Sequence, residues 1–246
     1  DLCDQFRPQR ILLETAGYLG IRHWVHHELF HAPLGEAEEM LLFLCFCPDC
    51  LARAAAMGVD GKAARDLAAR WTETLLRDER GALSPAFTIA DMPALLVESP
   101  ALYNYIHVRI ETTATLVQEA REIAARSDTR LEVMPSAFGR PVSRAFREGM
   151  TLRRLAQVSD ALIPLSYFAD PRETRADLRW TQMVSENAPM SVGLTACYPV
   201  ILSAGALAAN AAVCAEEGAQ GVYYYNYGMC SDERLEWVGR ANAQIE

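Results

Sequence analysis

Three cysteines lie close together at Cys45, Cys47 and Cys50, just after a run that holds four of the chain's five histidines. Thiolate and imidazole are the usual ligands of a tightly bound zinc ion. A tetrahedral site needs a fourth ligand from another segment, for which His31 is our first candidate and Cys230 an alternative. We expect a structural zinc that fixes a long loop, with free buried thiols as the alternative.

The histidine run, His23, His26, His27 and His31, offers a second kind of chemistry. Glu28 lies next to it, so the segment has the composition of a catalytic metal site or of a general acid–base site. Neutral imidazoles on a solvated loop are the simpler interpretation. We take His26 and His27 as the leading candidates for contact with a substrate.

The second half of the chain alternates between short apolar runs and segments with helical spacing. The apolar runs begin at residues 131, 161, 191 and 221, and helical patterns follow over 142–158, 172–186 and 204–217. An earlier strand is expected over 10–16, and a helix closes the chain. Strands that alternate with helices predict βαβ units and a parallel sheet.

We expect an α/β fold, a (β/α)8 TIM barrel, in preference to an open doubly wound sheet. No glycine-rich phosphate-binding fingerprint follows a strand, so no nucleotide cofactor is expected. Only about five βα units are visible, and we hypothesise that residues 1–246 are one partial barrel domain whose first three units precede residue 1. An elaborated loop and helical insert fills about 16–99, with an alanine-rich helical stretch over 51–80 and a long helix over about 100–126.

In such a barrel the functional side chains lie where the strands end. Glu14 ends the first apolar run, and a carboxylate there is costly to bury unless it is paired or used. A solvent-facing Glu at the rim of the strand is the alternative.

An apolar strand that ends in Glu, a His-rich loop and the Cys-x-Cys-x-x-Cys cluster resemble the glycoside-hydrolase-like TIM barrels, including uncharacterised bacterial members. More distantly, they resemble β-galactosidases that hold zinc with a similar cluster. The match covers residues 11 to about 58 and, more loosely, 224–228. The resemblance implies a hydrolase of carbohydrate metabolism in which Glu14 is the general acid/base, and a small-molecule or oligosaccharide substrate.

The second carboxylate that such chemistry needs is absent from the strand at 191–198, where these hydrolases place their nucleophile. Asp170 is the best visible candidate and Glu28 the next, although Asp170 before Pro171 is also a typical helix N-cap. An inverting hydrolase, a metal-dependent lyase or isomerase that uses the His-rich loop, and a non-catalytic carbohydrate-binding barrel stay open. Aromatic rings at the strand ends are suited to stacking on a sugar. They are Tyr18, Trp24, Tyr167, Phe168, Tyr198 and Tyr225.

Composition narrows the class of protein further. A net charge of −9, without a cluster of basic residues, argues against a nucleic-acid partner. No apolar stretch is long enough to predict a membrane span, and seven cysteines without a pairing pattern favour reduced thiols in the cytoplasm. The negative charge and the long helical insert are compatible with a homo-oligomer.

Overall fold

The structure is a computed structural model that describes residues 2–18, 36–76, 91–137, 140–243 and 245. The chain divides into two compact units, and each is discontinuous in sequence. Unit 1 contains Asp1–Ala16, Ala114–Ala145 and Met150–Glu246. Unit 2 contains Gly17–Thr113 and Phe146–Gly149. Residues 17–99 of the expected insert belong to unit 2.

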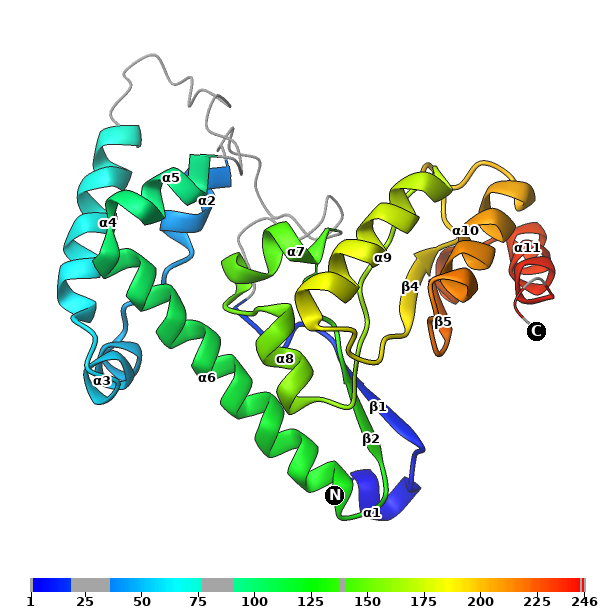
Figure 1. The fold of residues 1–246 in the computed structure, drawn as a ribbon, viewed down its shortest axis with the longest axis horizontal. Coiled ribbons are helices and arrows are strands. Elements are labelled where there is room, and N and C mark those ends of the chain that lie inside the picture. Colours follow the sequence, from blue (N-terminus) through cyan, green and yellow to red (C-terminus); the bar gives the residue numbers. More distant parts are fainter. Residues whose placement is uncertain (1, 19–35, 77–90, 138–139, 244, 246) are drawn as a thin grey trace. The chain divides into compact units, whose positions relative to one another are not determined.

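The strands of unit 1 lie where the apolar runs predict them. They are β1 (Arg10–Leu13), β2 (Arg130–Val133), β3 (Ala161–Leu162), β4 (Val192–Thr195) and β5 (Val222–Tyr225) (Figure 1). All pairings are parallel, with β1 on β2, β2 on β3, and β4 on β5. The prediction of parallel strands at these five positions is therefore confirmed.

The predicted TIM barrel, complete or partial, is wrong. The strands of the described residues form a three-stranded sheet, β1-β2-β3, and a two-stranded sheet, β4-β5, and neither closes on itself. Among the described residues, two isolated bridges, Leu162 to Met190 and Leu165 to Gly193, connect the β3 segment with the β4 segment. A physical reason lies at Pro164, which has no N–H to donate and interrupts the ladder after two residues of β3.

Helices cover one face of these strands and bury the alternate side chains. They include the C-terminal part of α6 (Pro100–Ala125), α7 (Pro141–Arg144) and α8 (Leu152–Val158). Next come α9 (Pro171–Ser185), α10 (Ala204–Glu216) and α11 (Asp232–Asn242), while α1 (Leu2–Phe6) precedes β1. Leu131 and Val133 pack in one core with Leu152 and Leu155. Val192, Leu194 and Tyr224 pack in a second core with α9, α10 and α11.

The opposite side-chain row remains more open. Side chains alternate along a strand, so Leu12, Tyr223 and Tyr225 point away from the helix-covered face and are exposed. The side chains of the run Tyr223–Tyr225 are therefore divided between two faces. Two short 3-10 turns, η1 (Ala145–Glu148) and η2 (Tyr227–Met229), connect these elements.

Unit 2 is helical in its described residues. It contains α2 (Glu36–Leu42), α3 (Pro48–Ala56), α4 (Gly61–Leu76), α5 (Asp91–Glu98) and the N-terminal part of α6. The alanine-rich helical stretch expected over 51–80 is divided between α3 and α4 in its described residues, because Gly58 takes a left-handed φ of +73° after α3. Asp60 then accepts a hydrogen bond from the amide of Ala63 at 2.9 Å and starts α4.

Residues 146–149 are fixed to unit 2 by a buried ion pair. Arg147 donates to Glu39 over 2.7 Å, and both side chains are nearly inaccessible to solvent. Phe146 packs against the apolar cluster of α2, α5 and α6. The short return of the chain at 146–149 is therefore an integral part of the core of unit 2.

Candidate functional site

Glu14 directly follows β1, and its side chain is exposed. Ligands of parallel α/β sheets bind beyond the carboxyl ends of the strands. The structure therefore places Glu14 at the edge where a ligand of unit 1 is expected.

Two of the predicted aromatic residues lie at the same edge as Glu14. Tyr167 follows β3 and Tyr225 ends β5, and their ring centroids are 5.8 Å apart. Burial raises the pKa of Tyr167 above its ordinary value, and Tyr225, Glu14 and Cys197 raise it further. Tyr167 is thus a protonated phenol at neutral pH, and it interacts electrostatically with Glu14.

The end of β4 completes this edge with polar atoms. The amide of Cys197 donates to Thr195 Oγ1 at 3.1 Å, and the Cys197 thiol donates to the Tyr225 carbonyl at 3.4 Å. Tyr198 is 74% exposed. We call Glu14, Tyr167, Thr195, Cys197 and Tyr225 the strand-end cluster.

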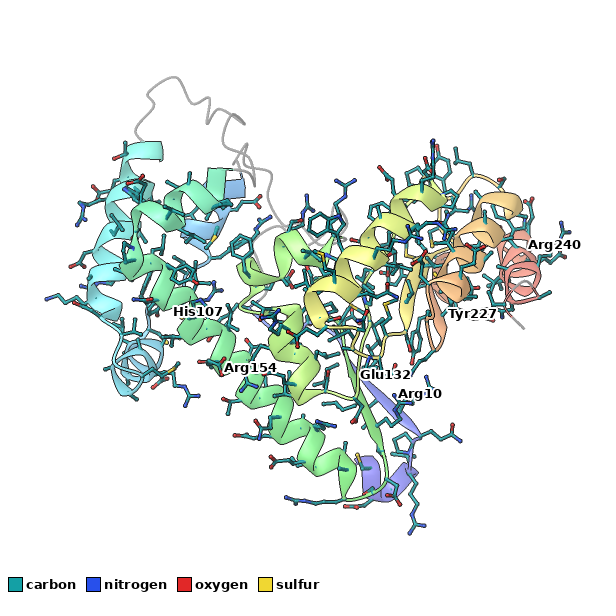
Figure 2. All side chains as sticks on the ribbon, viewed as in Figure 1. Arg10, His107, Glu132, Arg154, Tyr227 and Arg240 are labelled. Carbon is teal, nitrogen blue, oxygen red and sulfur yellow. The ribbon has the colours of Figure 1, made fainter. Side chains whose placement is uncertain are left out.

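A buried carboxylate on the sheet itself was missed by the sequence analysis. Glu132 on β2 is fully buried, accepts a hydrogen bond from Arg10 at 3.3 Å and another from the Tyr223 hydroxyl at 2.8 Å (Figure 2). Burial and then Glu132 raise the pKa of Tyr223. Because these residues come from β1, β2 and β5, they fix three strands to one another. The signal in the sequence was a charged residue inside an apolar run.

The Asp170 carboxylate, a predicted catalytic group, caps a helix instead. As the N-cap of α9, this carboxylate accepts a hydrogen bond from the amide of Arg172 at 2.9 Å. It also forms an ion pair with the Arg172 guanidinium at 2.7 Å. These bonds hold its pKa below the usual value. The alternative interpretation as a helix cap is confirmed.

Asp177, on α9, is a second carboxyl group that the sequence analysis missed. It accepts a hydrogen bond from Ser166 at 2.9 Å and is 8% exposed, and burial raises its pKa to about 6. It borders a pocket of about 460 Å³ whose walls include Phe168 and Trp180. Helical spacing predicted α9, but no sequence pattern indicated that Asp177 would lie on the buried face of this helix.

The cysteine cluster of unit 2 has the geometry of a metal site. The sulfur atoms of Cys45, Cys47 and Cys50 all lie within 4.8 Å of one another, so the group can bind a metal ion. Cys47 is the N-cap of α3, and Tyr105 on α6 fixes the preceding turn by donating its hydroxyl to the Cys45 carbonyl at 2.6 Å. The helix start and Tyr105 thus position the thiols before any metal binds.

The surroundings of the cluster shift the pKa values of two of its thiols in opposite directions. The Cys50 amide, followed by the neighbouring thiols, lowers the pKa of Cys47, whereas burial raises that of Cys50 to about 12. Arg109 is 2% exposed, and its Nε and Nη2 atoms have no hydrogen-bond partner among the described residues. Its guanidinium lies 4.3 Å from the centre of the Tyr18 ring and interacts electrostatically with Cys45 and Cys50. Thiolates at the cluster would therefore supply a countercharge to Arg109.

Tyr18 therefore belongs to the surroundings of the cysteine cluster in unit 2. Its amide donates to the Glu148 carbonyl at 2.8 Å. The remaining predicted ligands and contacts lie outside the described residues. They are Trp24, His26, His27, Glu28 and His31.

Comparisons with known proteins give no match: no family model, no curated protein and no solved structure is similar to this chain. No helix among the described residues is both long enough and apolar enough to cross a membrane. The functional argument therefore depends on the geometry of the strand-end cluster and of the cysteine cluster.

Proposed function

We propose that the chain is a carbohydrate-acting hydrolase in which Glu14 is the general acid/base. The observation that supports this most is the convergence of Glu14, Tyr167 and Tyr225 at the carboxyl ends of β1, β3 and β5. A carboxylate beside a phenol and an exposed aromatic ring is a suitable set for a hydroxylated substrate with an apolar face.

Each residue would have a distinct role. Glu14 is exposed and can exchange a proton with a leaving-group oxygen. Tyr167 keeps its proton because burial raises its pKa, so it can donate a hydrogen bond to a sugar oxygen. The Tyr225 ring is 38% exposed and offers a face for stacking.

Asp170 is not part of the proposed chemistry, because its carboxylate already caps α9 and pairs with Arg172. The proposal therefore assigns proton transfer to Glu14 and makes no claim about a covalent intermediate, which needs a second carboxylate close by. The resemblance to glycoside-hydrolase-like proteins supports the substrate class, whereas the barrel that it implied is no part of the proposal.

The test is hydrolysis of a panel of aryl glycosides and natural oligosaccharides by the whole chain. We expect Glu14→Gln to reduce kcat by about 10²- to 10⁴-fold, the usual contribution of a general acid/base. Glu119→Gln is the matched control, because Glu119 is an exposed carboxylate on α6. No turnover of any glycoside, or equal rates for Glu14→Gln and the unsubstituted chain, would contradict the proposal. Loss of activity on addition of a chelator, with Glu14→Gln active, would favour the metal-dependent lyase or isomerase instead.

We also propose that the metal of the cysteine cluster is zinc and that its role is structural. Three thiolates are typical of zinc sites that stabilise a fold, and Arg109 would balance their charge. We expect zinc to copurify in a 1:1 ratio by elemental analysis and to be lost in Cys50→Ser, while Cys214→Ala retains it. Cys214 is the control because it is buried in the core of unit 1. Zinc bound equally by Cys50→Ser would contradict the assignment.

A further inference from the structure

Cys197 of the strand-end cluster and Cys230 of the neighbouring turn have their sulfur atoms close together. Cys197 follows β4 and Cys230 follows η2, and their sulfur atoms are 3.9 Å apart. A disulfide needs a sulfur–sulfur distance of about 2.05 Å, so the two atoms must approach by roughly 1.9 Å. The approach requires the two side chains and the exposed turn to move toward each other.

The two sulfur atoms differ in accessibility in the way that a stepwise exchange requires. Cys197 is 8% exposed and is held by its hydrogen bond to the Tyr225 carbonyl. Cys230 is partly exposed and sits immediately before α11. A small oxidant can therefore reach Cys230 first, and Cys197 is placed to react second.

The chain around this pair is anchored, so the thiols stay facing each other. Arg234 on α11 donates to the carbonyls of Ala196 at 2.7 Å and Ile201 at 2.8 Å. This holds the segment of Cys197 against the helix that follows Cys230. Burial and the neighbouring Cys197 raise the pKa of Cys230, and the charge of Arg234 partly opposes this shift.

We propose that Cys197 and Cys230 form a reversible dithiol–disulfide pair that is oxidised by low-molecular-weight disulfides. The Cys230 thiolate attacks one sulfur of the small disulfide, forms a mixed disulfide and releases one small thiol. The Cys197 sulfur then attacks Cys230 Sγ, forms the internal disulfide and releases the second small thiol. The protein loses two electrons and two protons, and the small disulfide gains them and becomes two thiol molecules.

Cys214 and the three cysteines of unit 2 lie in other surroundings than this pair. Cys214 is fully buried in the core of α9, α10 and α11, and burial raises its pKa to about 12. Cys45, Cys47 and Cys50 form their own cluster in unit 2. Oxidation of the Cys197–Cys230 pair removes the thiol proton that Cys197 donates to the Tyr225 carbonyl, which changes the strand-end cluster.

The test uses the whole chain with zinc present, incubated in mixtures of reduced and oxidised glutathione. Samples are quenched in acid, alkylated after unfolding and mapped by peptide mass spectrometry. We expect one internal crosslink, between Cys197 and Cys230, with an intact mass lower by two hydrogen atoms and full reversal by dithiothreitol. Cys197→Ser should retain glutathione on Cys230, and Cys230→Ser should form no crosslink. Cys214→Ala is the control and should crosslink like the unsubstituted chain.

Three results would overturn the proposal. Both cysteines could remain open to alkylation at every glutathione ratio, glutathione could persist on Cys230 in the unsubstituted chain, or the crosslink could involve another cysteine. The peptide map of the unsubstituted chain decides the matter even if a variant fails to fold, which circular dichroism would reveal. This readout requires no hydrolytic activity, so it is independent of the proposed function.

Discussion

Asp177 keeps its proton to a higher pH than an exposed aspartate, because burial raises its pKa to about 6 from 3.8. Between these two values the folded chain holds a proton that the unfolded chain releases. The free energy of unfolding should therefore fall as the pH rises from about 4 to 6, by up to about 3 kcal/mol from this group. Urea unfolding at several pH values measures the slope. Asp177→Asn should remove this contribution, Glu119→Gln should keep it, and parallel profiles for Asp177→Asn and the unsubstituted chain would refute the assignment.

Asp170 allows a prediction that separates capping from catalysis. Its carboxylate caps α9 and pairs with Arg172, so Asp170→Ala should lower the thermal midpoint of unfolding. Asp170→Asn should unfold close to the unsubstituted chain, since asparagine caps equally well. Neither variant should change kcat for a hydrolysed glycoside by as much as Glu14→Gln. A loss of turnover in a normally stable Asp170→Asn would return Asp170 to the active site.

Among the elements of unit 2, the contact of α3 with α4 permits no extra atom at Gly61. A Cβ there would lie 2.9 Å from Leu51 Cδ2, 3.1 Å from Ala54 Cβ and 3.1 Å from Tyr105 Cε2. We expect Gly61→Ala to destabilise the chain by about 1–3 kcal/mol, the usual range for overpacking, although alanine favours helices. Gly239→Ala on α11 meets no atom within 4 Å and should stabilise instead. Chemical unfolding of both variants compares them, and a stabilising Gly61→Ala would show that the helices separate readily.

Local patterns predicted the elements better than their assembly. The apolar runs located β1, β2, β4 and β5, and helical spacing located α6, α9 and α10. The barrel was wrong because closure depends on pairing between distant strands, which Pro164 and the two-residue β3 restrict. Glu14, Tyr167 and Tyr225 were predictable because each follows or ends a strand. Glu132 and Asp177 were not, because their roles arise from burial among residues distant in sequence.

At the scale of the whole molecule, unit 2 depends on four residues that lie far along the chain. Arg147→Met would remove the ion pair of buried Glu39, at a cost of about 3–5 kcal/mol. We expect a matching loss in urea unfolding followed by circular dichroism. Arg153→Met is the control, because its pair with Glu186 is largely exposed, and it should change stability little. Equal effects of the two variants would argue against an integral role for 146–149.

The pairing of β1 with β2 also sets an order of events during synthesis. Arg10 leaves the ribosome well before its partner Arg130, by about 6–24 s at the usual bacterial and eukaryotic rates of translation. During that interval the apolar segment of β1 has no strand to pair with. Unit 2 still lacks residues 146–149. The nascent chain is therefore exposed to aggregation while the residues between β1 and β2 are synthesised. We expect the folding of this chain to depend on chaperones that bind apolar segments. This dependence should be stronger than for a protein whose units are contiguous in sequence.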